Sequence, residues 1–320
     1  MASVLVVIPC LNEAQSIERL VTQLIRNNPA LSMRIVIVDG GSSDDSVDIA
    51  IRLALRYPQV SCLHNAKRWQ SAAVNLAIAQ YDSDCRYFIR LDAHAEYPDD
   101  YCKQLLAEAE VRHPASVVVA MNSRGKTWFQ RAAAAAQNSR IGNGGSPHRR
   151  ATGNGKWIDH GHHALMRTDI FRAVGGYDET FSHNEDAELD LRLIKAGYSI
   201  WLTPKTHIVY HPRSSPLALF KQYYNYGRGR CRTFLRHREK LKLRQMLPLA
   251  VLPAAILALL APIHWLLTAP FMLWALLCLT YGAILGIWKL DIAAMASGLA
   301  AMIMQLGWSL GFWRGLYHNE

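Results

Sequence analysis

The sequence predicts an α/β domain built on a parallel sheet, followed by a C-terminal helical transmembrane region. Three short apolar runs rich in β-branched residues, at positions 4–8, 34–38 and 87–91, each end abruptly at a polar cluster. A buried parallel strand has this pattern when its carboxyl end opens onto a crevice. From residue 246 onward almost all charge disappears, which is typical of membrane helices.

Strands and helices alternate along the first 200 residues. We expect helices at residues 17–25, 47–55, 71–79, 99–112, 127–137 and 185–196. Further strands are predicted at residues 60–63, 117–121, 163–166 and 200–203. This alternation predicts right-handed βαβ units in a parallel sheet. Residues 142–150, rich in Gly and basic residues, form either a lid or a linker.

The positive charge of the chain is concentrated in one band. The net charge is +10, yet residues 228–244 contain eight Lys or Arg and one acid, a net of +7. Such a band directly before an apolar region indicates the cytoplasmic face of a membrane, not a nucleic-acid surface. The six cysteines are scattered without a framework, and the N-terminus shows no signal sequence. We therefore expect the first domain in a reducing cytoplasm.

Three apolar stretches follow, at residues 246–267, 271–288 and 292–313. A span needs about 20 apolar residues, so the first and third are long enough and the second is marginal. Because only residues 268–270 link the first two, these form either a tight hairpin or a partly re-entrant pair. A buried helical core is the alternative, and the lack of any polar face speaks against it. The predicted domains are 1–227, an interfacial segment 228–245, and a membrane region 246–320 with two or three transmembrane helices.

Three carboxylates follow the three apolar strands: Glu13, Asp39 and Asp92. The carboxyl ends of parallel strands share one edge, so a nucleotide with a divalent metal is the economical explanation. Asp92 and His94 are spaced i, i+2 and point the same way in an extended chain. Their donor atoms suit Mg²⁺ or Mn²⁺.

A second group of acids starts the helix predicted at residues 185–196. The helix dipole explains one or two acids there, but not four. Asp186 and Asp190 lie one turn apart on the same face. Crowded carboxylates raise one another's pKa, which makes one of them suitable as a general base.

Histidines and arginines give weaker signals. We interpret His160, His162 and His163 as structural or acceptor-contacting, because neighbouring residues of a strand face opposite ways. An isolated His211 is either structural or a metal ligand. Arg228 and Arg230 either meet anionic lipid, neutralise a diphosphate leaving group, or do both.

The order of motifs resembles a family 2 glycosyltransferase with a GT-A fold, a Rossmann-like mixed sheet, over about the first 230 residues. The motifs are Pro9-Cys10-Leu11-Asn12-Glu13, Asp39-Gly40-Gly41-Ser42-Ser43-Asp44, Asp92-Ala93-His94, Gly175-Gly176-Tyr177-Asp178-Glu179 and Glu185-Asp186. The Asp-Ala-His variant and the apolar tail are most similar to succinoglycan-type exopolysaccharide glucosyltransferases of bacteria.

This resemblance implies roles for individual residues. Pro9, Glu13 and Asp39 would cradle the uracil and ribose of a UDP-sugar, with Lys67 near the nucleotide. Asp92, His94 and His211 would hold Mn²⁺ or Mg²⁺ on the diphosphate. Asp186, next to Glu185, would be the base. His94 replaces the Asp of most relatives, which weakens a site for a hard cation.

We therefore expect inverting transfer of a hexose, glucose above all, from a UDP-sugar to a hydroxyl of a polyprenyl-diphosphate-linked saccharide. The enzyme would sit at the bacterial inner membrane, in contact with membrane lipids, with its catalytic domain in the cytoplasm. The alternatives are a sugar nucleotidyltransferase and a non-catalytic, membrane-anchored protein that binds a nucleotide sugar. A nucleotidyltransferase would carry a Gly-rich, Arg-containing loop where this chain has residues 9–13.

Overall fold

The computed structural model describes residues 3–81, 85–146 and 153–318. The chain divides into two compact units, one of residues 1–121 and 151–209, the other of residues 122–150 and 210–320. The domain boundaries at residues 227 and 245 stay a prediction. The loop predicted at 142–150 begins in a short helix α6 (Arg140–Asn143), and its part from residue 147 onward lies outside the described residues.

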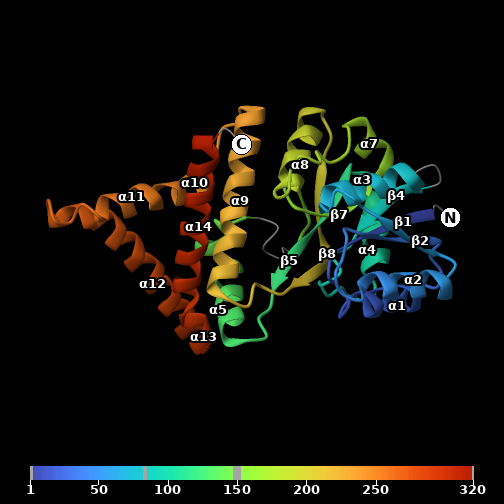
Figure 1. Ribbon diagram of the computed structural model, residues 1–320, viewed down its shortest axis with the longest axis horizontal. Helices are drawn as coiled ribbons and strands as arrows, with labels where there is room; N and C mark the ends of the chain where they lie inside the picture. Colours follow the sequence, from blue (N-terminus) through green and yellow to red (C-terminus); the bar gives the residue numbers. More distant parts are fainter. Residues whose placement is uncertain (1–2, 82–84, 147–152, 319–320) are drawn as a thin grey trace. The chain divides into compact units, whose positions relative to one another are not determined.

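The first unit is organised by a sheet with the strand order β3-β2-β1-β4-β7-β5-β8-β6 (Figure 1). The strands are β1 (Ser3–Cys10), β2 (Met33–Asp39), β3 (Val60–His64), β4 (Cys85–Arg90), β5 (Ser116–Ser123), β6 (Lys156–Ile158), β7 (His162–Arg167) and β8 (Ile200–Tyr210). Strands β3, β2, β1 and β4 are parallel, whereas β7 runs antiparallel to both β4 and β5. A purely parallel sheet was therefore the wrong expectation, and the mixed sheet that the resemblance implied is confirmed. The alternation of strands and helices carries no information about the direction in which β7 is inserted.

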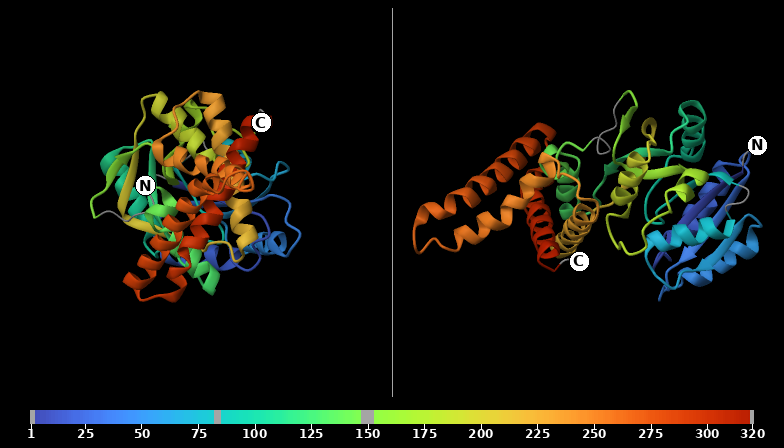
Figure 2. Two further views of the ribbon diagram at one scale, coloured as in Figure 1. Left: turned by 90° about the vertical axis from the view of Figure 1, so that its left-hand side faces the viewer. Right: turned by 90° about the horizontal axis from the view of Figure 1, so that it is seen from above.

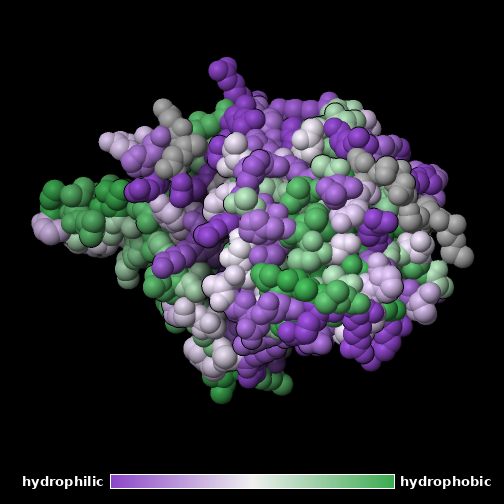
Figure 3. All heavy atoms as spheres, turned by 45° about the vertical axis from the view of Figure 1, so that its right-hand side comes forward, coloured by the Kyte–Doolittle hydropathy of each residue, from purple (hydrophilic) through white to green (hydrophobic). Residues whose placement is uncertain are grey.

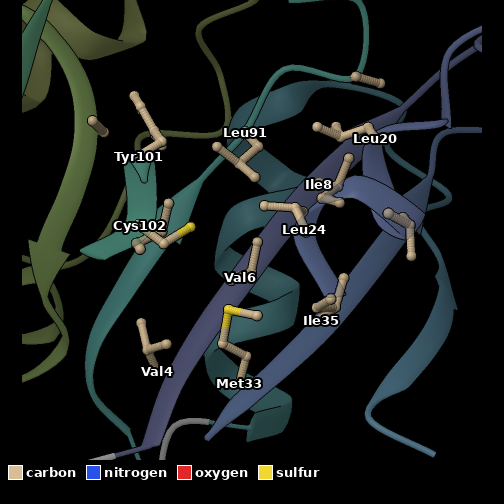
Figure 4. Packing of buried hydrophobic residues seen from close by; sticks show 14 of the residues in the cluster. Val4, Val6, Ile8, Leu20, Leu24, Met33, Ile35, Leu91, Tyr101 and Cys102 are labelled. Atoms are coloured by element: carbon tan, nitrogen blue, oxygen red, sulfur yellow. The ribbon is translucent and has the colours of Figure 1, made fainter. Parts of the chain in front are cut away.

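Helices cover both faces of this sheet. They are α1 (Ile17–Asn27), α2 (Ser46–Arg56), α3 (Gln70–Tyr81), α4 (Tyr101–Arg112), α7 (Thr168–Ala173) and α8 (Glu185–Lys195). Val6 and Ile8 of β1 pack with Leu20 and Leu24 of α1 on one face (Figure 4). On the other face, Val7 lies in a cluster with residues of α3, α7 and α8. Both faces of β1 are buried, which is why its sequence is continuously apolar.

The second unit consists of the last residues of β5 and β8 together with helices. The helices are α5 (Trp128–Gln137), α6, α9 (Pro216–His237), α10 (Leu243–Met246), α11 (Val251–Ala258), α12 (Ala269–Lys289), α13 (Ile292–Met295) and α14 (Ser297–His318). Helices α9 and α14 lie side by side (Figures 1 and 2). Two apolar helical stretches, Trp265–Lys289 and Ile292–His318, are long enough to be candidate membrane spans among the described residues.

The apolar stretch predicted at residues 246–267 does not form a spanning helix. It is divided into a 3₁₀ turn at Leu247–Ala250, the eight-residue α11, and a second 3₁₀ turn at Trp265–Thr268. Pro248 and Pro262 supply no backbone N–H and disfavour a continuous helix through this segment. The stretch at 271–288, which seemed marginal, lies instead within the long helix α12.

Candidate active site

Glu13 and His94 meet at the carboxyl edge of the sheet although they follow different strands. The Nδ1 atom of His94 lies 2.7 Å from Oε1 of Glu13. The second oxygen of Glu13 accepts a hydrogen bond of 2.7 Å from Ser16, and its backbone N–H donates to Ser46. The segments that follow β1 and β4 therefore meet, as predicted, through the contact between Glu13 and His94.

Asp39 is buried at the end of β2 and organises the turn that follows it. One carboxylate oxygen accepts hydrogen bonds from the backbone N–H groups of Gly41 (2.7 Å) and Ser42 (3.1 Å), and the other accepts from the Ser42 hydroxyl. Gly41 has φ +86°, a left-handed conformation that glycine adopts without strain. Asp39 therefore fixes the conformation of the turn that follows β2. Pro9 lies opposite Val38 in the β1–β2 pairing, one residue before this level.

Asp92 follows β4 and faces a polar environment. Its Oδ1 accepts a hydrogen bond of 3.0 Å from Gln70, and its Oδ2 lies 3.7 Å from Nε2 of His162. Burial alone would raise the pKa of Asp92, but Arg90 and His162 outweigh it and lower the pKa below its usual value. Burial also lowers the pKa of His162 to about 4, against the opposing effect of Asp92. Asp92 is thus ionised beside a neutral imidazole at neutral pH.

Asp186 is held by a buried arginine that the sequence interpretation missed. Arg90 donates from both terminal nitrogens to the two oxygens of Asp186, at 2.7 and 3.0 Å. The hydroxyl of Tyr177 donates a further hydrogen bond of 2.8 Å to Asp186. Burial would raise the pKa of Asp186, yet Arg90 lowers it far below its usual value. The signal that could have identified Arg90 was its position after the apolar run Tyr87–Ile89, two residues before Asp92.

Glu185 is the acid whose pKa is raised. Burial first, and then the neighbouring charge of Asp186, raise the pKa of Glu185 to about 7. No ion pair or side-chain hydrogen bond joins this carboxylate to another of the described residues. The expectation that crowding raises the pKa of one acid in this cluster is correct for Glu185 and wrong for Asp186, because Arg90 supplies a positive charge that the local sequence does not show.

One turn farther along α8, Asp190 binds two of the three predicted histidines. Its Oδ2 lies 2.6 Å from Nδ1 of His160, and its Oδ1 lies 3.0 Å from Nε2 of His163. Both His163 and Asp190 are fully buried, and His163 also contacts Ser116. Burial works against ionisation of this pair, but their mutual attraction raises the pKa of His163 and lowers that of Asp190. These contacts fasten α8 to the sheet.

The remaining predicted residues lie farther from this cluster or in the other unit. Lys67 pairs with Glu179, which joins the segment before α3 to the loop before α8. His211 contacts the carbonyl of Arg124 at 2.8 Å, and Arg228 and Arg230 lie on α9. These three residues belong to the second unit, and their roles toward the donor stay predictions.

Comparison with known proteins identifies the family. The model of glycosyl transferase family 2 matches residues 5–175. The succinoglycan biosynthesis protein ExoA of Rhizobium meliloti is 54% identical over 315 residues, which cover 98% of this chain and 95% of that protein. The chain belongs to glycosyl transferase family 2. The resemblance predicted from the sequence motifs is thereby confirmed.

More distant similarities agree with this glycosyltransferase assignment. An undecaprenyl-phosphate 4-deoxy-4-formamido-L-arabinose transferase of Pseudomonas syringae is 34% identical over 127 residues, 38% of this chain and 37% of that protein. Among solved structures, the mannosyltransferase PcManGT of Pyrobaculum calidifontis, in complex with GDP-Man and Mn²⁺, has a TM-score of 0.65. It is 17% identical, and the match covers 100% of this chain and 88% of that one. At this identity the structural match supports the GT-A fold alone.

The metal site predicted from the sequence stays a prediction. Among the described residues, no group of three or more His, Cys, Asp or Glu side chains is placed to hold one. A divalent ion that binds a nucleotide often takes only one or two protein ligands, since phosphates and water complete its shell. Asp92 and His94 therefore stay the predicted ligands, and the ionised state of Asp92 suits a hard cation.

Proposed function

We propose that the protein transfers a hexose, glucose above all, from a UDP-sugar to a hydroxyl of a lipid-linked saccharide in bacterial exopolysaccharide synthesis, with inversion at the anomeric carbon. Two relatives support this choice, one a succinoglycan biosynthesis protein and the other an undecaprenyl-phosphate 4-deoxy-4-formamido-L-arabinose transferase. The observation that carries the proposal is the acid cluster at the start of α8. Asp186 of this cluster pairs with Arg90 at the end of β4, and Asp92 follows that strand.

The donor side of the site would be built from the edge of β1, β2 and β4. Pro9, Glu13 and Asp39 would receive the uracil and ribose, with Lys67 at the rim. Asp92 and His94 would hold Mn²⁺ or Mg²⁺, which would supply positive charge to stabilise the departing nucleoside diphosphate. Arg228 and Arg230 would add positive charge at the same leaving group. His211 would be a further ligand of the ion.

The acceptor proton would go to Glu185. A general base works best when its pKa lies near the working pH, and the pKa of Glu185 is about 7. Both oxygens of Asp186 already accept hydrogen bonds from Arg90, and its lowered pKa makes it a weak base. This assignment departs from the resemblance, which implies Asp186 as the base. Asp186 would instead position Arg90 and Glu185.

The proposed reaction is a single displacement. The acceptor hydroxyl gives its proton to Glu185, and its oxygen forms a bond to the anomeric carbon from the face opposite the diphosphate. The bond from the anomeric carbon to the diphosphate oxygen breaks, and its electron pair leaves with UDP. One base and one stabilised leaving group are sufficient for inversion.

The test is a donor screen with the full-length protein in membranes. UDP-glucose, other UDP-hexoses and GDP-mannose are offered with Mn²⁺, with Mg²⁺ and with a chelator, and labelled sugar is measured in the lipid extract. We expect label in lipid from UDP-glucose, a β-linked product from an α-linked donor, and loss of transfer with the chelator. Label appearing in a sugar nucleotide together with pyrophosphate would indicate a nucleotidyltransferase instead. Donor binding without any transfer to lipid would indicate a binding protein.

We also propose the bacterial inner membrane as the location, with the catalytic unit in the cytoplasm. Supporting this are the candidate spans and the positive band at residues 228–244, since cytoplasmic segments next to membranes carry excess Lys and Arg. Fractionation of cells and protease treatment of intact spheroplasts test this location. We expect the protein in the inner-membrane fraction and its catalytic unit protected in spheroplasts.

A further inference from the structure

The second unit contains an apolar hairpin, residues 255–273. The residues on either side of this hairpin both contact α14. On the first arm, the backbone N–H of Leu252 donates to the Ser309 hydroxyl at 3.1 Å. On the second arm, the indole N–H of Trp274 donates to the side chain of Gln305 at 2.7 Å. The hairpin therefore leaves α14 by α11 and returns to it by α12 (Figure 1).

The side chains of this hairpin are predominantly apolar. Residues 255–273 include no Asp, Glu, Lys or Arg. Leu259, Ile263 and Trp265 are 78%, 76% and 71% exposed. Apolar side chains gather over the protruding part of this unit in Figure 3. Burial of such a surface is strongly favourable, and lipid is the partner that its predominantly apolar composition fits, with His264 and Thr268 as its polar side chains.

The hairpin is too short to reach the other side of a bilayer. Each arm has about nine residues, and at a rise of about 1.5 Å per residue it extends roughly 14 Å. The hydrocarbon core of a bilayer is about 30 Å thick. The tip around Ile263 would therefore end within the hydrocarbon core.

Helix α14, although apolar and long, is locked to a charged helix. A Cβ atom added at Gly311 would lie 2.0 Å from the carbonyl oxygen of Tyr224, and one added at Gly307 would lie 2.7 Å from that of Phe220. The backbones of α9 and α14 thus touch along several turns, and α14 could cross a membrane only together with α9. The cationic residues of α9 are Lys221, Arg228, Arg230, Arg232 and Arg236. Each such charge costs about 2.5–3.5 kcal/mol at the centre of a bilayer.

The turn between the two candidate spans is joined by an ion pair to α5, the helix that follows β5 in the chain. Asp291 forms an ion pair of 2.8 Å with Arg131 of α5. Only residues 124–127 separate α5 from the end of β5. Four residues extend at most about 14 Å, so α5 and the sheet lie on the same side of any bilayer. If α12 and α14 both crossed, this turn would be on the opposite side.

We infer that the chain enters the membrane by a re-entrant hairpin from the catalytic side, and that α14 does not cross. The bilayer takes up the apolar hairpin, and Trp288, 86% exposed beside Lys289, lies at the level of the headgroups. The apolar outer face of α12 extends to this end, so the helix enters the leaflet obliquely. The number of complete crossings contributed by residues 246–318 is then zero.

Cysteine labelling of the full-length protein in sealed membrane vesicles tests this topology. Leu290→Cys reports on the turn and Ile263→Cys on the hairpin tip. Leu55→Cys, at a residue 84% exposed on α2, reports on the catalytic side. Each variant is treated with a membrane-impermeant maleimide in vesicles of both orientations. The unaltered chain is the blank for the native cysteines, which are buried or partly buried.

We expect Leu290→Cys to be labelled in the same vesicles as Leu55→Cys. Ile263→Cys should be protected from the maleimide in vesicles of both orientations until the membrane is dissolved with detergent. Labelling of Leu290→Cys only in the opposite vesicles would overturn the inference in favour of two spans. Labelling of Ile263→Cys in intact vesicles of either orientation would also overturn it. If a variant fails to fold, trypsin cleavage after Lys289 of the unaltered chain tests the same point. Cleavage in the vesicles that expose the catalytic side supports the inference, and cleavage only in the opposite vesicles overturns it.

Discussion

Arg90 and Asp186, separated by 96 residues in the chain, form a two-pronged ion pair in which both nitrogens of the guanidinium meet both oxygens of the carboxylate. The Arg90 side chain is 3% exposed and that of Asp186 is 18% exposed. The pair joins the end of β4 to the start of α8. It therefore connects the strand that carries Asp92 to the helix that carries Glu185.

Replacement of Arg90 should destabilise the fold strongly. Arg90→Met would leave the Asp186 carboxylate buried without its cation, and such a change costs about 3–5 kcal/mol. The matched control is Arg86→Met on the same strand. Its partner Glu110 is 48% exposed, and an exposed pair contributes about 0–1 kcal/mol. Denaturant unfolding of the two solubilised variants should show this contrast, and equal losses would contradict it.

The two acids of the α8 start should differ in their effect on the rate. If Glu185 is the base, Glu185→Gln should lower kcat by about 10²–10⁴ with little change in donor KM. Asp186→Asn should lower kcat less and should also reduce stability, because Arg90 loses its anionic partner. Steady-state kinetics across pH 5–9 measures both. The reverse result, an inactive but stable Asp186→Asn and an active Glu185→Gln, would restore Asp186 as the base.

The pH dependence of kcat should report the ionisation of Glu185. Since a base must be ionised to accept a proton, kcat of the unaltered enzyme should fall as the pH drops below about 7. In Asp186→Asn the neighbouring negative charge is lost, so the pKa of Glu185 should decrease and this fall should move to lower pH. A profile that keeps its position in Asp186→Asn would argue against Glu185.

Stability should also depend on pH through Glu185. Its pKa is about 7 in the folded chain and near 4.5 in the unfolded chain, so the folded state binds the proton more tightly. The resulting stabilisation is complete below about pH 4.5 and is lost as the pH rises to about 7. At pH 8, Glu185→Gln should therefore be more stable than the unaltered chain, by about 3 kcal/mol at most. At pH 4 the two should be equal.

Glu179 provides a control for this experiment, because its pKa is shifted in the direction opposite to that of Glu185. Burial opposes ionisation of Glu179, but hydrogen bonds from Lys67 and Asn75 lower its pKa. The stabilisation is present at neutral pH and is lost as the pH falls. Glu179→Gln should thus be less stable than the unaltered chain at pH 8. Glu185→Gln should exceed Glu179→Gln in stability by more at pH 8 than at pH 4, and a difference that is no larger at pH 8 would contradict the proposed charge states.

A carboxylate at position 94 should couple metal binding to stability. In His94→Asp the new carboxylate would face Glu13, whose Oε1 now lies 2.7 Å from the imidazole. Two anions at this distance repel each other without a cation and bind a hard cation better. We expect a lower Mn²⁺ concentration for half-maximal donor binding and a lower melting temperature in a chelator. His113→Asp, the same change at the end of α4, should alter neither.

Much of the fold follows from local patterns in the sequence. The strand β1 is apolar on both faces, and the turn after β2 carries Asp39 with two glycines, so a buried strand and a turn at its neighbour's end were predictable. The antiparallel insertion of β7 was not predictable, because neighbours in a sheet are chosen by long-range packing. The membrane span predicted at residues 246–267 was also wrong. The hydropathy of this segment indicates a span, but its prolines and its contacts with α14 divide it.

The sequence by itself determined where acids stand relative to the elements: after β1, β2 and β4, and in a run at the start of α8. Only the tertiary structure decided the charge state of each acid. Arg90 forms its ion pair with Asp186 and not with Glu185, and this distinction depends on distances of a few ångströms between distant segments. Electrostatic energy varies steeply with such distances in a poorly solvated environment, and linear order in the chain does not specify them.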